Sequence, residues 1–207
     1  MAEPLSELWV ARIPGLVPYA EGVALQERVR ALRQEDRIPD ALLLLEHSPV
    51  FTRGRRTEAA DLPFGDDWYR ERGVEVHDTD RGGRVTYHGP GQLVGYPIMR
   101  IDDVLEYVRT MERAMIAALS DEGIDAGLRE GLTGVWVENR KIGSIGVHVS
   151  RGVTTHGFAV NVENDLEPFE WVVACGIGGV QMTSVRQEGG EGIDCFRKRM
   201  AWRFAEA

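Results

Sequence analysis

Five consecutive apolar residues, 41–45, constrain the fold of this chain more than any other segment. The run has the length of a strand, and it lacks the alternation of a strand with one solvent-facing side. Such a run is best explained as a central strand that is buried on both faces. The sequence therefore predicts a sheet that is flanked by helices.

The rest of the chain mixes strand and helix patterns. Pro14-Gly15 is expected to end a first strand that begins at Leu8. Asp102 and Asp103 are suited to cap a helix whose apolar residues recur at helical spacing until Gly123. Further helices are expected at 19–33 and 193–204, and further strands at 133–138, 141–150 and 153–162. This order predicts an α+β fold around a mixed or antiparallel sheet.

Composition narrows the classes of function. No repeat or linker divides the 207 residues, so we expect one domain over 1–207. The net charge of −9 argues against binding to nucleic acid or anionic membranes, which need a basic surface. The apolar runs are too short to cross a bilayer, and the acidic N-terminus lacks a signal-peptide pattern. Having only two cysteines argues against a disulfide framework. We expect a cytoplasmic monomer with reduced thiols.

Glycine marks where a binding site could lie. Many of the 24 glycines fall in three segments, 81–92, 141–146 and 175–179. Glycine within strand-like sequence costs stability and often marks close approach of the backbone to a ligand. One such segment could be turn chemistry alone, but three of them favour a site. The spacing fits neither a P-loop nor a dinucleotide fingerprint.

Two residues beside the glycines could carry chemistry. Cys175 stands where a strand-like segment opens into glycines. A buried small hydrophobe is one interpretation, and a nucleophile beside oxyanion-binding amide groups is the other. Lys141 enters a glycine-bearing strand, although spacing alone would leave it a solvated charge. Cys195 lies in an amphipathic helical pattern, and we interpret it as structural.

Histidine and arginine give weaker signals. His47 fits a cap or turn, whereas His77 and His148 lie in strand-like sequence. His88 and His156 each precede a glycine, and a substrate-orienting role and a structural one stay equally open for them. No spacing is typical of metal ligands, so no metal is expected. Five arginines form either a solvated loop or a positive rim suited to an acidic partner or a phosphate: Arg53, Arg55, Arg56, Arg81 and Arg84.

Several segments, taken together, resemble the lipoyl(octanoyl) transferase family. They match it in order and spacing across nearly the whole chain, and each alone is weak. They are residues 46–52, 81–97, 134–137 with 141–147, and 156–162 with 175–177 and 183–185. The resemblance implies the α+β catalytic domain shared with biotin and lipoate protein ligases.

The resemblance also implies an activity. The family moves an octanoyl group from the thioester of acyl carrier protein to a lysine ε-amine of lipoyl domains. Such domains occur in 2-oxoacid dehydrogenase complexes and in the glycine-cleavage H protein, and the product then receives sulfur in lipoate synthesis. No cofactor is implied for the enzyme itself, because the donor carries its own phosphopantetheine.

Site residues follow from the resemblance position by position. Cys175 becomes the acyl-accepting nucleophile and Lys141 its partner, and His156 and Gly89 are possible auxiliary residues. The acyl-substrate positions are Arg81, Gly82, Gly83, Arg84, Val85, Thr86, Tyr87, His88, Ser144, Ile145, Gly146, Gly157, Phe158 and Ala159. Two alternatives remain, an ATP-dependent lipoate or biotin protein ligase on the same fold and a non-catalytic acyl-binding module.

Overall fold

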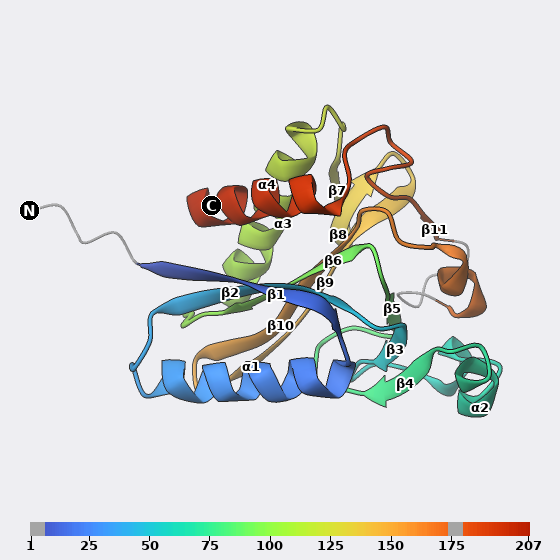
Figure 1. Cartoon of the computed structure of the whole chain (residues 1–207), viewed down its shortest axis with the longest axis horizontal. Coiled ribbons are helices and arrows are strands. Elements are labelled where there is room, and N and C mark those ends of the chain that lie inside the picture. The colour runs from blue at the N-terminus through green and yellow to red at the C-terminus, as the bar shows by residue number, and fades with distance from the viewer. Residues whose placement is uncertain (1–6, 174–179) are drawn as a thin grey trace, which may run out of the picture.

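The computed structural model describes residues 7–173 and 180–207 of the chain. Within them a larger sheet has eight strands, of which seven lie in the order β1-β2-β6-β10-β9-β8-β7 and β11 pairs with β9 (Figure 1). These strands are β1 Leu8–Val17, β2 Asp40–His47, β6 Gln92–Ile98, β7 Gly127–Arg129, β8 Leu132–Val137, β9 Arg140–Ser150, β10 Val153–Asn161 and β11 Gln181–Met182. β1 runs parallel to β2, whereas β2, β6, β10, β9, β8 and β7 pair antiparallel in turn. The predicted α+β fold with a mixed sheet is confirmed.

The apolar run 41–45 lies in β2, between β1 and β6. Leu42 and Leu44 join the hydrophobic cluster on one face of the sheet, and Leu43 and Leu45 join the cluster on the other face. This division follows from the alternation of side chains along a strand. The prediction that this strand is buried on both faces is therefore confirmed.

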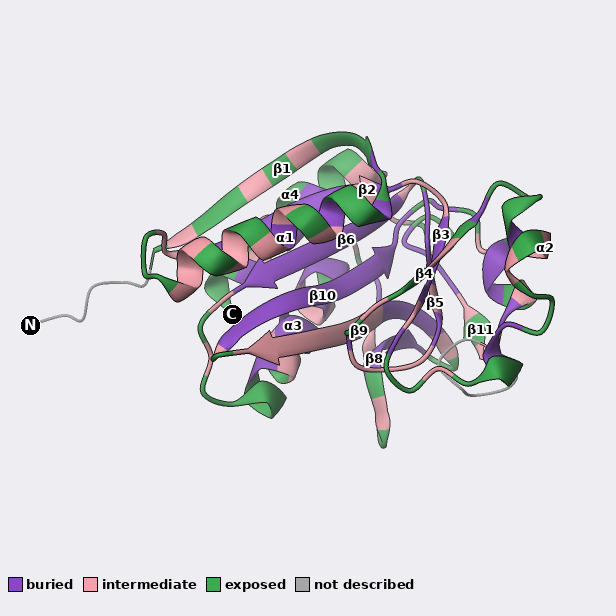
Figure 2. Ribbon diagram, turned by 90° about the horizontal axis from the view of Figure 1, so that it is seen from below, coloured by how far each residue is buried: buried purple, intermediate pink, exposed green. Residues whose placement is uncertain are grey.

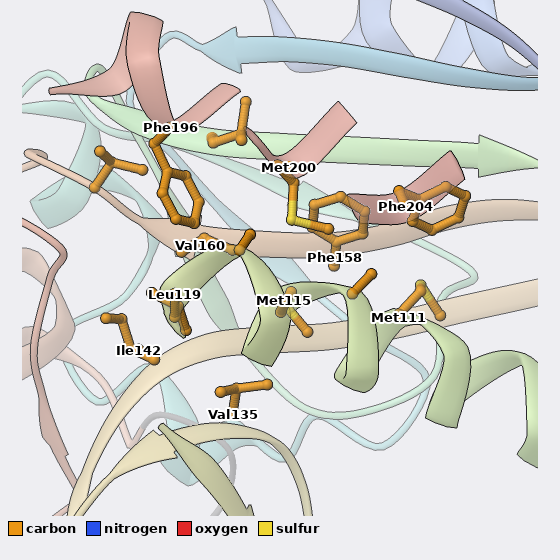
Figure 3. Close-up of a cluster of buried hydrophobic side chains, with 14 of the residues drawn as sticks. Met111, Met115, Leu119, Val135, Ile142, Phe158, Val160, Phe196, Met200 and Phe204 are labelled. Carbon is orange, nitrogen blue, oxygen red and sulfur yellow. The ribbon is translucent and has the colours of Figure 1, made fainter. Parts of the chain in front are cut away.

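Helices cover both faces of the larger sheet. Helix α1, Tyr19–Gln34, lies on one face, while α3, Val104–Ser120, and α4, Ile193–Glu206, lie on the other (Figure 1). Figure 3 shows Met111, Met115 and Leu119 of α3 facing Phe196, Met200 and Phe204 of α4, with Phe158 and Val160 of β10 completing the cluster. Figure 2 shows that β6 and β10 are buried along their length, whereas α1 exposes one side.

A second sheet lies beside the larger one and carries part of the site. Its strand order is β4-β3-β5, with β3 Val50–Arg53, β4 Glu75–Asp78 and β5 Thr86–His88. The short helices α2 Asp66–Arg70, η1 Ala59–Asp61 and η2 Glu167–Trp171 complete the elements of the described chain. Phe51, Tyr69, Tyr87 and Phe169 fill the core of this part.

The first strand is longer than expected from the sequence. Pro14-Gly15 does not end it, because β1 continues to Val17 with a shift of register between Arg12 and Leu16. β1 is an edge strand, so a proline that lacks an N–H can be accommodated at an irregularity instead of ending the strand. The expected capping of α3 is confirmed, since the Asp103 carboxylate accepts from the N–H groups of Leu105 and Glu106.

No helix in residues 7–173 and 180–207 is both long and apolar enough to cross a membrane.

Candidate active site

A cavity of about 480 Å³ lies between β9, β10 and the loop that precedes β5. This volume is typical of small-molecule binding sites. Tyr19 of α1, Val108 of α3 and Trp136 of β8 also line it. Most of the residues that the sequence predicted for the site share this cavity: Arg81, Gly82, Gly83, Arg84, Val85, Thr86, His88, Lys141, Ser144, Ile145, Gly146, His156, Gly157, Phe158 and Ala159.

Two predicted residues stand apart from this lining, and a third lies outside the described residues. Tyr87 is buried in the cluster that contains Phe51 and Phe169, because side chains alternate along β5. Gly89 packs against that tyrosine, since a Cβ at Gly89 would lie 2.2 Å from the Tyr87 hydroxyl. Cys175 lies outside the described residues, so its predicted role as nucleophile stays a prediction.

Two glycines that face each other across the β9–β10 pair place no side chain in the cavity wall and allow close approach of the backbone. Gly146 pairs with Gly157 in the ladder. A Cβ at Gly157 would lie 2.3 Å from the carbonyl oxygen of Gly95, and one at Gly146 would lie 3.0 Å from that of Gly82. The N–H of Gly82 also donates to the carbonyl of Val147 over 2.9 Å. The loop before β5 is therefore held directly against β9 by backbone contacts that a larger residue would disturb.

Arg81 fastens the same loop to the second sheet. Its side chain is buried, and its guanidinium donates to the carbonyl oxygen of Thr52 over 2.6 Å and to the Thr52 hydroxyl over 2.8 Å. A planar guanidinium with several donors suits such a multiple contact. Arg81 thus places a fixed positive charge in the cavity wall.

The other arginines differ in whether a carboxylate compensates their charge. Arg84 pairs with Asp61 over 2.9 Å and with Glu58 over 2.8 Å. Arg53 pairs with Asp66 and Asp78. Local carboxylates therefore compensate the charges of both arginines. Arg55 and Arg56 are exposed, and Arg56 lines the cavity.

Lys141 is a buried lysine in the cavity wall, with only 5% of its surface exposed. Its Nζ lies 5.4 Å from the centre of the Trp136 ring, a cation–π distance. Gly134, at φ +114°, leaves room for it, because a Cβ there would lie 2.8 Å from Cε of Lys141. The chain has only one other lysine, Lys198, which is exposed on α4. Burial makes Lys141 unlike the solvated charge that spacing alone would suggest.

Two buried histidines on β2 and β5 are neutral at pH 7. Burial lowers the pKa of His47 to about 4 and that of His88 to about 3. His47 contacts the carbonyl of Val17 through Nδ1 over 2.7 Å and the Tyr96 hydroxyl through Nε2 over 2.6 Å. His88 contacts Gln92 Oε1 through Nδ1 over 2.7 Å.

His156 combines a strained backbone with an acidic partner. Its φ is +59°, and its main-chain N–H donates to Gln26 Oε1 over 2.6 Å. Its Nε2 lies 2.8 Å from Asp80 Oδ1, and His148 Nε2 lies 3.4 Å from the other oxygen of the same carboxylate. Burial lowers the pKa of His156 although Asp80 opposes that shift. Side-chain contacts thus hold an unusual backbone conformation at the cavity wall.

Several polar residues of the site are not among those that the sequence predicted. Tyr19 and Tyr96 line the cavity, and Gln92 and Asn161 are buried behind it. They come from α1, β6 and β10, so only the fold brings them together. Within the described part of the chain, no group of three or more His, Cys, Asp or Glu side chains is placed to hold a metal ion.

Comparison with protein families identifies a catalytic-domain family that matches most of the chain. Residues 18–204 fit the model of the lipoyl protein ligase A/B catalytic domain. An octanoyltransferase of Rubrobacter xylanophilus is 45% identical over 197 residues, which cover 93% of this chain and 89% of the relative. An octanoyltransferase of Acidobacterium capsulatum is 45% identical over 191 residues, which cover 84% of this chain and 78% of the relative.

Solved structures agree on the fold. A bipartite lipoate protein ligase from Thermoplasma acidophilum has a TM-score of 0.72 at 20% identity, covering 97% of this chain and 82% of its own. The biotin protein ligase of Aquifex aeolicus has a TM-score of 0.53 at 12% identity, covering 97% and 68%. At such identities the likeness concerns the fold alone, and it confirms the predicted kinship of architecture. Together, the matched family model and these relatives show that the chain belongs to the lipoyl protein ligase A/B catalytic domain family, among the octanoyltransferases.

Proposed function

We propose that this chain transfers an octanoyl group from octanoyl-acyl carrier protein to a lysine ε-amine of a lipoyl domain. As a member of the octanoyltransferases it is an acyltransferase. The observation that carries the finer proposal is one cavity lined by both Lys141 and the predicted acyl-binding segments. Lipoyl domains of 2-oxoacid dehydrogenase complexes and the glycine-cleavage H protein are the proposed acceptors.

The proposed reaction has two steps. The Cys175 thiolate attacks the thioester carbonyl, the C–S bond to the carrier breaks, and the carrier thiol leaves with the proton that Lys141 took from Cys175. The acceptor amine then attacks the acyl-cysteine, so that a C–N bond forms and the C–S bond breaks. Lys141 takes the proton that the amine loses, and the Cys175 thiolate is restored. The two steps consume no ATP and use no metal ion.

Burial of the acyl chain supplies binding energy. An octanoyl tail has six methylenes, and at about 0.8 kcal/mol each their burial contributes at most about 5 kcal/mol. A change of two carbons alters this by only about 1.6 kcal/mol, so strong selection for length also needs a closed end to the cavity. Phe158 and Ala159 come from the buried strand β10 and are suited to form such an end.

The carrier protein is expected to dock beside the loop that precedes β5. Arg55 and Arg56 are exposed there, and their main-chain N–H groups donate to the carbonyls of Arg81 and Gly83, each over 3.0 Å. Acyl carrier proteins and lipoyl domains are typically acidic. On a chain of net charge −9, these two arginines offer the local attraction that docking needs.

The test is to incubate the chain with octanoyl-acyl carrier protein and to weigh it by mass spectrometry. The proposal expects one octanoyl group on Cys175, absent in Cys175→Ala and present in Cys195→Ser. A lipoyl domain added afterwards should take the group from the enzyme. An adduct that persists unchanged in Cys175→Ala would contradict the acyl-enzyme.

Omission of ATP separates the proposed transferase from an ATP-dependent ligase. An ATP-dependent ligase would need ATP, form an acyl-adenylate and dispense with Cys175. A non-catalytic module would bind the carrier protein and never acquire a covalent adduct. Transfer without ATP through Cys175 would exclude both.

A further inference from the structure

Behind the cavity, hydrogen bonds connect His88 of β5, through the side-chain amides of Gln92 and Asn161, to Thr183 in the segment after β11. Nδ1 of His88 contacts Gln92 Oε1 over 2.7 Å, and Gln92 Nε2 donates to Asn161 Oδ1 over 3.0 Å. Asn161 Nδ2 in turn donates to the main-chain carbonyl of Thr183 over 3.1 Å. Gln92, Asn161 and Thr183 are each 4% exposed or less, so water competes little for these bonds.

Main-chain carbonyls fix the orientation of both side-chain amides, because a carbonyl oxygen can only accept a hydrogen bond. The Thr183 carbonyl requires the NH₂ group of Asn161 on its side, which turns Asn161 Oδ1 toward Gln92. The Tyr87 carbonyl accepts from Gln92 Nε2 over 3.1 Å and sets the orientation of that amide as well. Gln92 Oε1 therefore faces His88, and Nδ1 of His88 must carry the hydrogen.

The charge state of His88 completes the assignment. Burial lowers its pKa, and the neighbouring His47, Arg81 and His156 lower it further, while Gln92 opposes the shift. An imidazole that is neutral and carries its hydrogen on Nδ1 has a lone pair on Nε2. His88 lines the cavity and is 7% exposed, and the contact with Gln92 Oε1 engages Nδ1 of its ring, not Nε2.

We propose that the Gln92–Asn161 amides hold His88 as the Nδ1–H tautomer, so that its Nε2 accepts a hydrogen bond from an N–H group of the bound substrate. His88 then contacts substrate directly, and Gln92 and Asn161 are positioning residues. The proposal rests on the acyl transfer proposed above, which offers two sources of such an N–H group. One is an amide of the donor's phosphopantetheine arm, and the other is the amine of the acceptor lysine.

The same amides also connect His88 to the strand that carries Lys141. Thr183, whose carbonyl ends the chain of amides, donates its own N–H to the carbonyl of Lys141 over 3.0 Å. The hydrogen-bond acceptor and the buried lysine are thus fixed by one continuous set of bonds. A set that satisfies each of its members rigidifies the groups it connects.

The tautomer is measured by long-range proton–nitrogen NMR on the histidine rings. The chain has five histidines, and loss of one set of signals in His88→Asn assigns His88. We expect a protonated Nδ1 and a bare Nε2 at pH 7. A bare Nδ1, or two protonated nitrogens at that pH, would overturn the proposal. Gln92→Met removes the acceptor at Nδ1, and it should shift the His88 ring toward the Nε2–H tautomer.

Binding is tested with octanamide, which has N–H donors, against methyl octanoate, which has none. Saturating octanamide should shift the Nε2 signal of His88, and saturating methyl octanoate should not. This readout needs no turnover, so it separates failure of the inference from failure of the proposed transferase activity. An Nε2 signal that does not respond to octanamide would contradict the proposed contact.

Two variants with the half-reactions measured separately identify the source of the N–H group. The amide of His88→Asn can keep the contact with Gln92 but loses the acceptor at the Nε2 position, whereas His88→Gln can restore an acceptor there. His88→Asn should slow one half-reaction by about tenfold, and His88→Gln should recover part of that rate. Slower loading of Cys175 would assign the donor arm, and slower discharge to a lipoyl domain would assign the acceptor amine. If His88→Asn has the wild-type rate in both half-reactions and melts at the wild-type temperature, the proposal is wrong.

Discussion

The N–H of Thr183 donates to the main-chain carbonyl of Lys141 over 3.0 Å. Lys141 also pairs with Trp136 of β8 on its other side and with Met182 of β11. A strand that is held on both sides has little freedom, so the direction in which the lysine side chain leaves it is fixed. The buried amine of Lys141 is thereby placed by the backbone ladder, which suits a group that must act at one defined point.

Replacing Lys141 tests its proposed part in proton transfer. Lys141→Met keeps most of the side-chain volume and removes the amine, so the fold should persist while octanoyl transfer falls by about 10²- to 10⁴-fold. Lys198→Met is the matched control, because Lys198 is the other lysine of the chain and is exposed. Steady-state transfer to a lipoyl domain and circular dichroism measure the two effects. Wild-type turnover in Lys141→Met near neutral pH would refute the assignment.

Backbone crowding at Gly157 predicts a loss of stability in Gly157→Ala. The added Cβ would meet the Gly95 carbonyl at 2.3 Å and Pro97 Cδ at 2.4 Å, so strands must shift. We expect a free energy of unfolding lower by about 1–3 kcal/mol. At Gly127, also in a strand, nothing lies within 4 Å of the added atom, and Gly127→Ala should stay within about 0.5 kcal/mol of wild type. Equal urea midpoints for both variants would argue against this packing.

The buried carboxylate of Asp61 predicts that Arg84 stabilises the fold. Asp61 is 1% exposed and accepts from Arg84 and from the N–H of Glu58. Arg84→Leu would leave the buried Asp61 carboxylate without its cation and should clearly lower the midpoint of urea unfolding. Arg70→Leu breaks an exposed pair with Asp67 and should cost less than about 1 kcal/mol. Similar costs for the two variants would contradict this difference in burial.

Buried His47 predicts a pH dependence of stability. Its pKa is about 4 in the folded chain and returns to about 6.5 on unfolding. The unfolded state therefore binds more protons between these values, so stability is full above pH 6.5 and falls as pH decreases toward 4. The slope that His47 contributes is up to about 1.4 kcal/mol per pH unit. Urea unfolding across this range measures it, and His47→Asn should reduce the slope. An unchanged slope in His47→Asn would be inconsistent with a neutral buried ring.

Long elements with a clear pattern could be predicted from the sequence. β2 shows as a continuous apolar run, and α3 shows its helical spacing together with the cap at Asp103. The short strands β3, β4, β5 and β11 have two to four residues each and therefore no period to detect. Pro14-Gly15 misleads because the cost of a proline depends on whether its strand lies at an edge, and a local pattern does not show that.

The residues of the site likewise divide into those that the sequence predicts and those that it does not. Glycine-rich segments and the family resemblance predict most of the cavity lining, because close backbone approach leaves a mark on the residues that make it. Tyr19, Gln92 and Asn161 belong to separate elements and resemble ordinary polar residues along the chain. The pairing of Arg84 with Asp61 likewise depends on packing, which is why the sequence alone leaves both a solvated loop and a positive rim open.

Single-turnover mass spectrometry of the chain with octanoyl-acyl carrier protein, in the absence of ATP, shows whether the acyl group passes through Cys175. We expect one octanoyl group on Cys175, formed more slowly in Lys141→Met and passed to the lysine of a lipoyl domain when that domain is added. An unmodified Cys175 beside an octanoylated lipoyl domain, or a strict need for ATP, would contradict it.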